Sequence, residues 1–304
     1  MSDGLVIVLT AGLVATATGL LGPFLVLRRV AHERDAVSHA VLPGIVAVFL
    51  LFGTRAPLPV IAGAAVFAVV CVLAIEALRS TGLVRGDAAI GLVFPALFSL
   101  GVLGIQRYAD DVHLDLDATI YGEIAFAPFR TLILPGELEV ARSLVILSLV
   151  CLANLGLVAL LWKELKATSF DPEFARTIGV SPTVLSRLLL IAVAITAVTA
   201  FESVGAILVV TMLIVPAATA YLLTDRLVAM VAIAVGLGWA SALGGYQVAV
   251  AADASIAGAM GLLAAALFVV ALVASSRYGL LARRVRRRRA RAHTARRLEA
   301  EAAR

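Results

Sequence analysis

Long apolar stretches separated by short polar segments run through most of the chain. We predict nine such segments, at about 5–27, 36–53, 57–79, 88–105, 142–163, 184–200, 203–223, 227–248 and 254–276. Helices of about 20 residues are long enough to cross the hydrocarbon core of a bilayer. The pattern predicts an all-α transmembrane bundle of eight or nine spans over residues 1–282, followed by a basic tail at 283–304.

The boundary between the sixth and seventh segments is ambiguous. Only Phe201 and Glu202 separate 184–200 from 203–223, and Pro216 interrupts the second segment. Proline removes a helical hydrogen bond and kinks or breaks a helix. The region is therefore compatible with two full spans or with broken, partly re-entrant helices.

The composition agrees with a polytopic membrane protein, because 62% of the residues are hydrophobic and only 15% are charged. The net charge of +5 arises in the tail, where eleven arginines and two glutamates follow residue 276. Such a cluster after a last span is typical of a cytoplasmic end in contact with lipid headgroups. Nucleic-acid binding is the alternative interpretation of the tail. The two cysteines lie in apolar runs and indicate packing rather than a disulfide.

Lysine and arginine follow every second segment, which predicts an orientation. Nine crossings place these clusters on the cytoplasmic side: Arg28, Arg29 and Arg34; Arg79 and Arg85; Lys163, Lys166 and Arg176; Arg226; and the tail. The other side then holds the N-terminus, Arg55, Glu202, Asp253 and the acidic loop 106–141. An eight-span count would reverse this arrangement.

Two loops carry recognisable patterns. Residues 121–128 mix apolar and acidic side chains, so they form either a short amphipathic element at the interface, with a docking role for a partner, or part of a solvated acidic loop. On the other side, Asp171 is a good N-cap, Pro172 suits the first helical position and Gly179 suits a C-terminal stop. We predict a helix of about two turns that exposes Phe174 and Ile178, either for a partner or for packing on the protein's own helix ends.

The candidate chemistry lies at the start of the second segment. Asp35 and His39 are four residues apart, so a helix would place them on one face, where they could bind one divalent cation. The alternatives are an N-cap for Asp35 and a packed histidine for His39. Glu202, water or a second copy of the chain could complete the coordination. There is neither a nucleotide-binding Gly-rich loop ending in Gly-Lys-Ser/Thr nor a His-Glu-x-x-His motif, so the sequence favours no ATPase or zinc protease of those types.

Several strings in order resemble one family. They are 24–29, the Ser-His-Ala-Val-Leu-Pro-Gly run at 38–44 with Asp35, and 91–98, 171–180, 204–210, 216–220 and 222–227. Together they make residues 5 to about 276 similar to the permease subunit of the manganese, zinc and iron importers of the ATP-binding-cassette superfamily. The resemblance implies a transport subunit that is not itself an enzyme, in a bacterial-type plasma membrane with its C-terminus in the cytoplasm.

The resemblance also implies partners and roles. The partners are a second copy of the chain, cytoplasmic ATPase subunits, an extracytoplasmic metal-binding protein and membrane lipids, without nucleic acid. The transported cation (Mn²⁺, Zn²⁺ or Fe²⁺) would contact Asp35, His39 and Glu202, with no permanently bound cofactor. An ATPase would dock on Asp171, Pro172, Glu173, Phe174, Ala175, Ile178 and Gly179. An ion-coupled secondary transporter or a membrane scaffold would be the competing classes, and no internal repeat favours the first.

Overall fold

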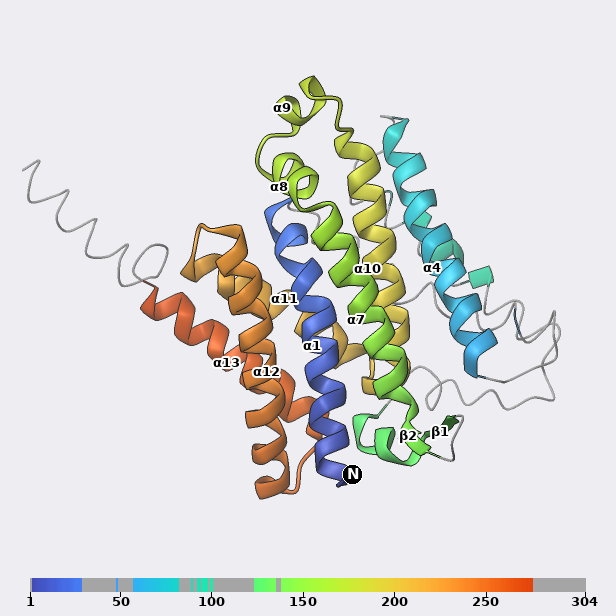
Figure 1. The fold of residues 1–304 in the computed structure, drawn as a ribbon, viewed down its shortest axis with the longest axis vertical. Coiled ribbons are helices and arrows are strands. Elements are labelled where there is room, and N and C mark those ends of the chain that lie inside the picture. The colour runs from blue at the N-terminus through green and yellow to red at the C-terminus, as the bar shows by residue number, and fades with distance from the viewer. Residues whose placement is uncertain are drawn as a thin grey trace, which may run out of the picture.

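The computed structural model describes residues 2–28, 48, 57–81, 89, 92–93, 95–97, 99–100, 123–134 and 138–275. The described chain is a bundle of long helices whose ends gather at two opposite poles (Figure 1). The helices are α1 (Asp3–Leu27), α4 (Pro57–Ser80), α7 (Arg142–Leu160), α8 (Trp162–Phe170), α9 (Pro172–Thr177), α10 (Pro182–Val204), α11 (Ala206–Leu223), α12 (Leu227–Ala252) and α13 (Ile256–Ala274).

Six of these helices, α1, α7, α10, α11, α12 and α13, are long and apolar enough to cross a membrane, and α4 contains a shorter apolar run at Ala62–Leu78. All seven coincide within a few residues with predicted segments, which confirms the transmembrane helical bundle. The predicted segments 36–53 and 88–105 fall largely outside the described residues, as does the tail 283–304.

The ambiguous region resolves into two helices, and the break between them lies a few residues after the predicted boundary at Phe201 and Glu202. Phe201 and Glu202 belong to the last turn of α10, and the chain turns at Gly205, whose φ is +82°. Such a φ is readily adopted only by glycine, which explains why the helix ends there. Pro216 lies inside α11, which continues without interruption to Leu223.

Helix α1 is the centre of the bundle, and it packs against α7, α10, α11 and α12. Polar side chains tie these helices together in the apolar interior. Thr10 and Ser143 share a hydrogen bond of 3.0 Å, and Asn154 on α7 donates to the Ala17 carbonyl (3.2 Å) and to Thr196 on α10 (2.8 Å). Trp239 on α12 donates to Thr16 at 3.0 Å. Interhelical hydrogen bonds of this kind stabilise membrane bundles, where apolar burial alone gives little driving force.

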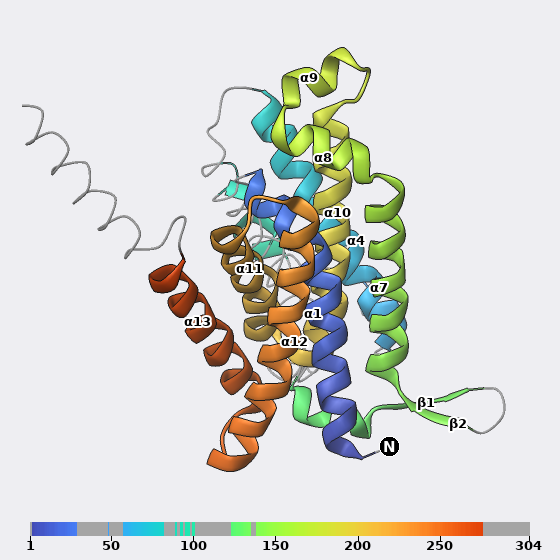
Figure 2. The same ribbon diagram turned by 60° about the vertical axis from the view of Figure 1, so that its left-hand side comes forward.

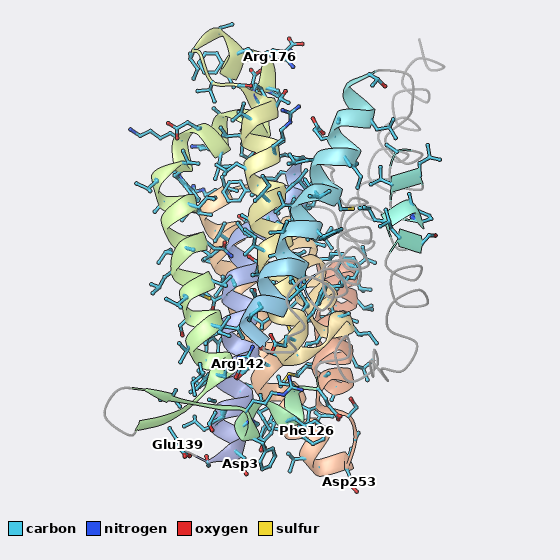
Figure 3. The ribbon with its side chains drawn as sticks, turned by 90° about the vertical axis from the view of Figure 1, so that its right-hand side faces the viewer. Asp3, Phe126, Glu139, Arg142, Arg176 and Asp253 are labelled. Carbon is cyan, nitrogen blue, oxygen red and sulfur yellow. The ribbon has the colours of Figure 1, made fainter. Side chains whose placement is uncertain are left out.

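The two poles carry different elements (Figures 1 and 3). One pole holds the N-terminus, Asp253, the 3₁₀ helix η1 (Ile124–Phe129) and the antiparallel strands β1 (Thr131–Leu134) and β2 (Leu138–Ala141). The other pole holds α8 and α9 (Figure 2). Arg28 follows α1 and Arg226 precedes α12 at the α9 pole, and Lys163, Lys166 and Arg176 lie within α8 and α9, so these cationic residues share one pole as the charge pattern predicted.

Close helix contacts around α1 depend on glycine. A Cβ atom on Gly22 would lie 2.5 Å from the Leu213 carbonyl oxygen of α11, so the helix backbones could not keep their present separation. Small residues permit this kind of close approach between membrane helices.

We expect Gly22→Ala to lower the stability of the bundle by about 1–3 kcal/mol, the usual cost of overpacking a tight interface. The measurement is the melting temperature of the detergent-purified chain. Gly156→Ala is the control, because a Cβ there meets nothing within 4 Å. Equal melting temperatures for Gly22→Ala and the wild type would show that α1 and α11 are not closely packed.

Candidate functional site: the α8–α9 pole and its opposite

Helix α9 is short but well defined at both ends. The Asp171 carboxylate accepts a hydrogen bond from the Phe174 backbone N–H at 2.9 Å, and Pro172 occupies the first turn. At the other end the Val180 N–H donates to the Ala175 carbonyl at 2.9 Å, with Gly179 at φ +81°. These are the N-cap and glycine stop that the sequence predicted, so the two-turn helix is confirmed.

Helix α9 exposes large apolar side chains that a folded monomer would ordinarily bury. Phe174 is 55% exposed and Ile178 is 54% exposed, whereas Ala175 beneath them is fully buried. Within the described part of the chain the two large side chains therefore do not pack on the protein's own helix ends. Phe170, at the end of α8, is equally exposed and enlarges the apolar surface.

Helix α8 was not predicted, because residues 162–170 read as a polar connection. It continues from α7 after a bend at Leu161 and carries α9 at its end. The position of α8 depends on Arg28, just beyond the end of α1. The Arg28 guanidinium donates to Ser169 (3.1 Å) and Thr168 (2.5 Å) on α8 and to Ser186 (2.9 Å) on α10.

The hydroxyl oxygens of Thr168 and Ser169 are free to accept hydrogen bonds from Arg28. Thr168 and Ser169 each donate their own proton to a carbonyl one turn back, at 2.8 Å and 2.6 Å, which leaves their lone pairs for the guanidinium. Burial lowers the pKa of Arg28 to about 10, so it still carries its charge at neutral pH. A cation held by three hydroxyls locks α1, α8 and α10 together at this pole.

At the opposite pole Glu202 pairs with a cation from another helix. Its Oε1 lies 2.8 Å from Nη2 of Arg142, and its backbone carbonyl accepts from Arg130 at 3.2 Å. A small cavity of about 20 Å³ adjoins the pair and is lined by Glu123, Ala127, Arg130, Arg142, Ser143, Ile146, Glu202 and Ser203. The ion pair fastens the end of α10 to the start of α7 (Figure 3 labels Arg142).

The η1 helix covers the same pole. Ile124 and Ala127 are buried, and η1 packs on α1, α10 and α13, whereas Phe126 and Phe129 are 55% and 72% exposed. The segment is therefore a packed amphipathic element and not a solvated loop. No cluster of three or more potential metal ligands occurs among the described residues. Asp35 and His39, the predicted cation pair, lie outside them, as does most of the acidic loop.

Comparisons with known proteins agree with this architecture. A model of the ABC 3 transport family matches residues 5–275. The chain belongs to this family. It is 44% identical over 278 residues to the zinc transport system membrane protein TroD of Treponema pallidum, covering 91% of this chain and 75% of that protein. It is 39% identical to the manganese transport system membrane protein MntD of Bacillus subtilis, covering 92% and 95%.

The fold of this family member also resembles a solved structure. PsaBC from Streptococcus pneumoniae in complex with Fab matches with a TM-score of 0.72 and 29% identity, over 90% of this chain and 91% of that one. The chain is thus a multi-pass membrane permease of the ABC 3 transport family and not an enzyme.

We expect Arg28→Gln to loosen α8, because the amide cannot reach three hydroxyls and the charge-assisted bonds are lost. The loss should be on the order of 2 kcal/mol, seen as a lower melting temperature and as faster proteolysis within 162–181. Arg176→Gln, a charge change on the exposed surface of α9, should alter neither. Unchanged proteolysis of Arg28→Gln would show that Arg28 does not hold α8.

Proposed function

We propose that this permease is the membrane-spanning subunit of an ATP-driven importer of divalent metal ions, acting as a homodimer with separate cytoplasmic ATPase subunits. The observation that carries the proposal is α9, a rigidly capped helix at one pole whose Phe174 and Ile178 are exposed. An exposed apolar surface of this kind favours a protein partner. Relatives named for zinc and manganese transport support a divalent cation as the cargo.

Coupling follows from how α9 is held. An ATPase bound to Phe174 and Ile178 would move α9, and α8 would move with it because the two helices pack together. Arg28 and its three hydroxyl partners would pass the displacement to α1 and α10. Closure of the ATPase dimer on ATP would then favour one of two arrangements of the spans, which is a population shift.

The orientation is part of the same proposal. The α9 pole faces the cytoplasm, together with the C-terminus and its arginine tail. The pole with η1, the β-strands and the Arg142–Glu202 pair faces outward, where an extracytoplasmic metal-binding protein would deliver the cation. The exposed Phe126 and Phe129 and the acidic residues of this pole suit such a partner.

The cation would be held by Asp35 and His39 in transit, since one oxygen and one nitrogen suit Mn²⁺, Zn²⁺ or Fe²⁺. Glu202 is a third candidate ligand, but its Oε1 is paired with Arg142, so only Oε2 would be left for a cation while that pair is intact. Incomplete coordination by the protein suits a transport site, because the ion must also be released.

The docking surface gives the first test of this function. Phe174→Asp places a charge in the proposed apolar interface, and we expect at least about tenfold loss of ATPase copurification, equivalent to about 1.4 kcal/mol, together with loss of uptake. Leu152→Asn, on the 63% exposed flank of α7, is a control for apolar exposure away from α9. Full ATPase recovery and normal uptake with Phe174→Asp would disprove docking at α9.

The cation pair gives the second test. Asp35→Asn and His39→Ala should each reduce metal uptake by about tenfold or more, with Mn²⁺, Zn²⁺ and Fe²⁺ assayed separately. The double variant should cost little more than either, because ligands of one ion act as a unit. Binding should weaken as pH falls through the histidine range, since only neutral imidazole ligates.

Permease abundance and ATPase association should stay at wild-type levels in these variants, which separates a binding defect from a folding defect. Intact uptake by both single variants at normal abundance would show that the pair is structural and that the pathway lies elsewhere.

A further inference from the structure

A groove at the α9 pole has no role in the proposed transport cycle. It lies between α8 and the first turns of α12 and encloses about 600 Å³, within the range of small-molecule sites. Its lining consists of Trp162, Lys166, Phe170, Asp225, Arg226, Leu227, Val228, Ala229 and Ala232.

The charged part of the lining favours an anion. Lys166 and Arg226 come from the two sides of the groove, against one carboxylate, that of Asp225. Neither Lys166 nor Arg226 forms an ion pair with any residue in the described ranges. Two cations on opposite walls suit a phosphate diester, which can accept from both at once.

The rest of the lining is apolar, and it borders α7 and α12, which are long and apolar enough to cross a membrane. Val228, in the lining, is 66% exposed, and Leu160, outside the lining at the end of α7, is 83% exposed. Along α12, Ala232 lies about 9 Å below Arg226 at the helical rise per residue. Trp162 stands where the α7 span ends, a level at which tryptophan is enriched in membrane proteins. The groove therefore offers charge at the surface and apolar contact below it.

We propose that this groove binds an anionic phospholipid such as phosphatidylglycerol, with the phosphate between Lys166 and Arg226 and the first acyl methylenes along Val228 and Ala232. A water-soluble anion would leave the apolar wall unused, whereas an amphiphile matches both parts. Basic pockets between membrane helices are known sites for acidic lipid headgroups. A bound lipid would join α8 to α12 and so hold the helix that carries α9.

Tryptophan fluorescence tests the proposal directly, because the chain has only two tryptophans, Trp162 and Trp239. In a Trp239→Phe background, the full-length permease in detergent is titrated with phosphatidylglycerol or phosphatidylcholine whose acyl chains are brominated near the carboxyl end. We expect phosphatidylglycerol to quench Trp162 at a severalfold lower concentration. Equal quenching by both lipids would overturn the proposal without any groove variant being needed.

Variants then locate the headgroup. Lys166→Gln with Arg226→Gln should abolish the preference for phosphatidylglycerol. Lys163→Gln, which removes one positive charge from α8 outside the lining, should retain it. A preference that survives the double variant would contradict the assignment.

Two further arms exclude other occupants. Millimolar inorganic phosphate should leave the quenching of Trp162 by the lipid unchanged. If phosphate fully reversed that quenching, the groove would be a simple anion site instead. Trp162 emission in lipid-free detergent should not depend on protein concentration. A strong dependence would show that a second copy of the chain covers the groove. Metal uptake and ATPase copurification are not readouts here, so failure of the lipid site leaves the proposed function standing.

Discussion

Close contact between α1 and its neighbours is the constraint on which this bundle depends. Lipid chains are as apolar as leucine, so burying apolar side chains gives membrane helices little reason to associate. Association instead requires close packing and interhelical hydrogen bonds. Helix α1 supplies both, with Gly22 against the α11 backbone, and with Thr10 and Thr16 bonded to α7 and α12. Among the described elements, α13 makes its main contacts with α11, α12 and η1, which agrees with its low burial.

Each of the two poles is also held by a polar contact between distant helices. At one pole Arg28 satisfies three hydroxyls from α8 and α10, and at the other Glu202 pairs with Arg142 from α7. Both are long-range ties made by charged groups at helix ends, where water is near and ionisable side chains cost least. Each tie joins helices that are distant in sequence, and it adds a charged contact at the pole to the neutral hydrogen bonds and close packing of the bundle interior.

The sequence predicts those elements whose structure depends on residues close together in the chain, and it misses those that depend on distant partners. Span length is a property of a continuous apolar run, so seven helices were placed within a few residues. The ends of α9 follow from Asp171, Pro172 and Gly179 alone. In contrast, α8 depends on Arg28, more than a hundred residues earlier, and no local pattern in 162–170 indicates that partner. Phe201 and Glu202 separated the sixth and seventh predicted segments, but Glu202 lies in the last turn of α10, where Arg142 pairs with its charge. The Asp35–His39 pair stays a prediction.

The arrangement also limits how motion at α9 can reach the far pole. Helix α1 runs the length of the bundle, from η1 at its first turns to Arg28 just beyond its last. Its bonds to α7 and α12 and its tight contact with α11 leave little room for it to slide alone. A displacement delivered through Arg28 would therefore move α1 with these neighbours as one body rather than bend it, since packed cores change by discrete steps and not by gradual deformation. The Arg142–Glu202 pair joins α7, within that body, to α10, so relative motion of these two helices at the outer pole has to break or rotate this contact.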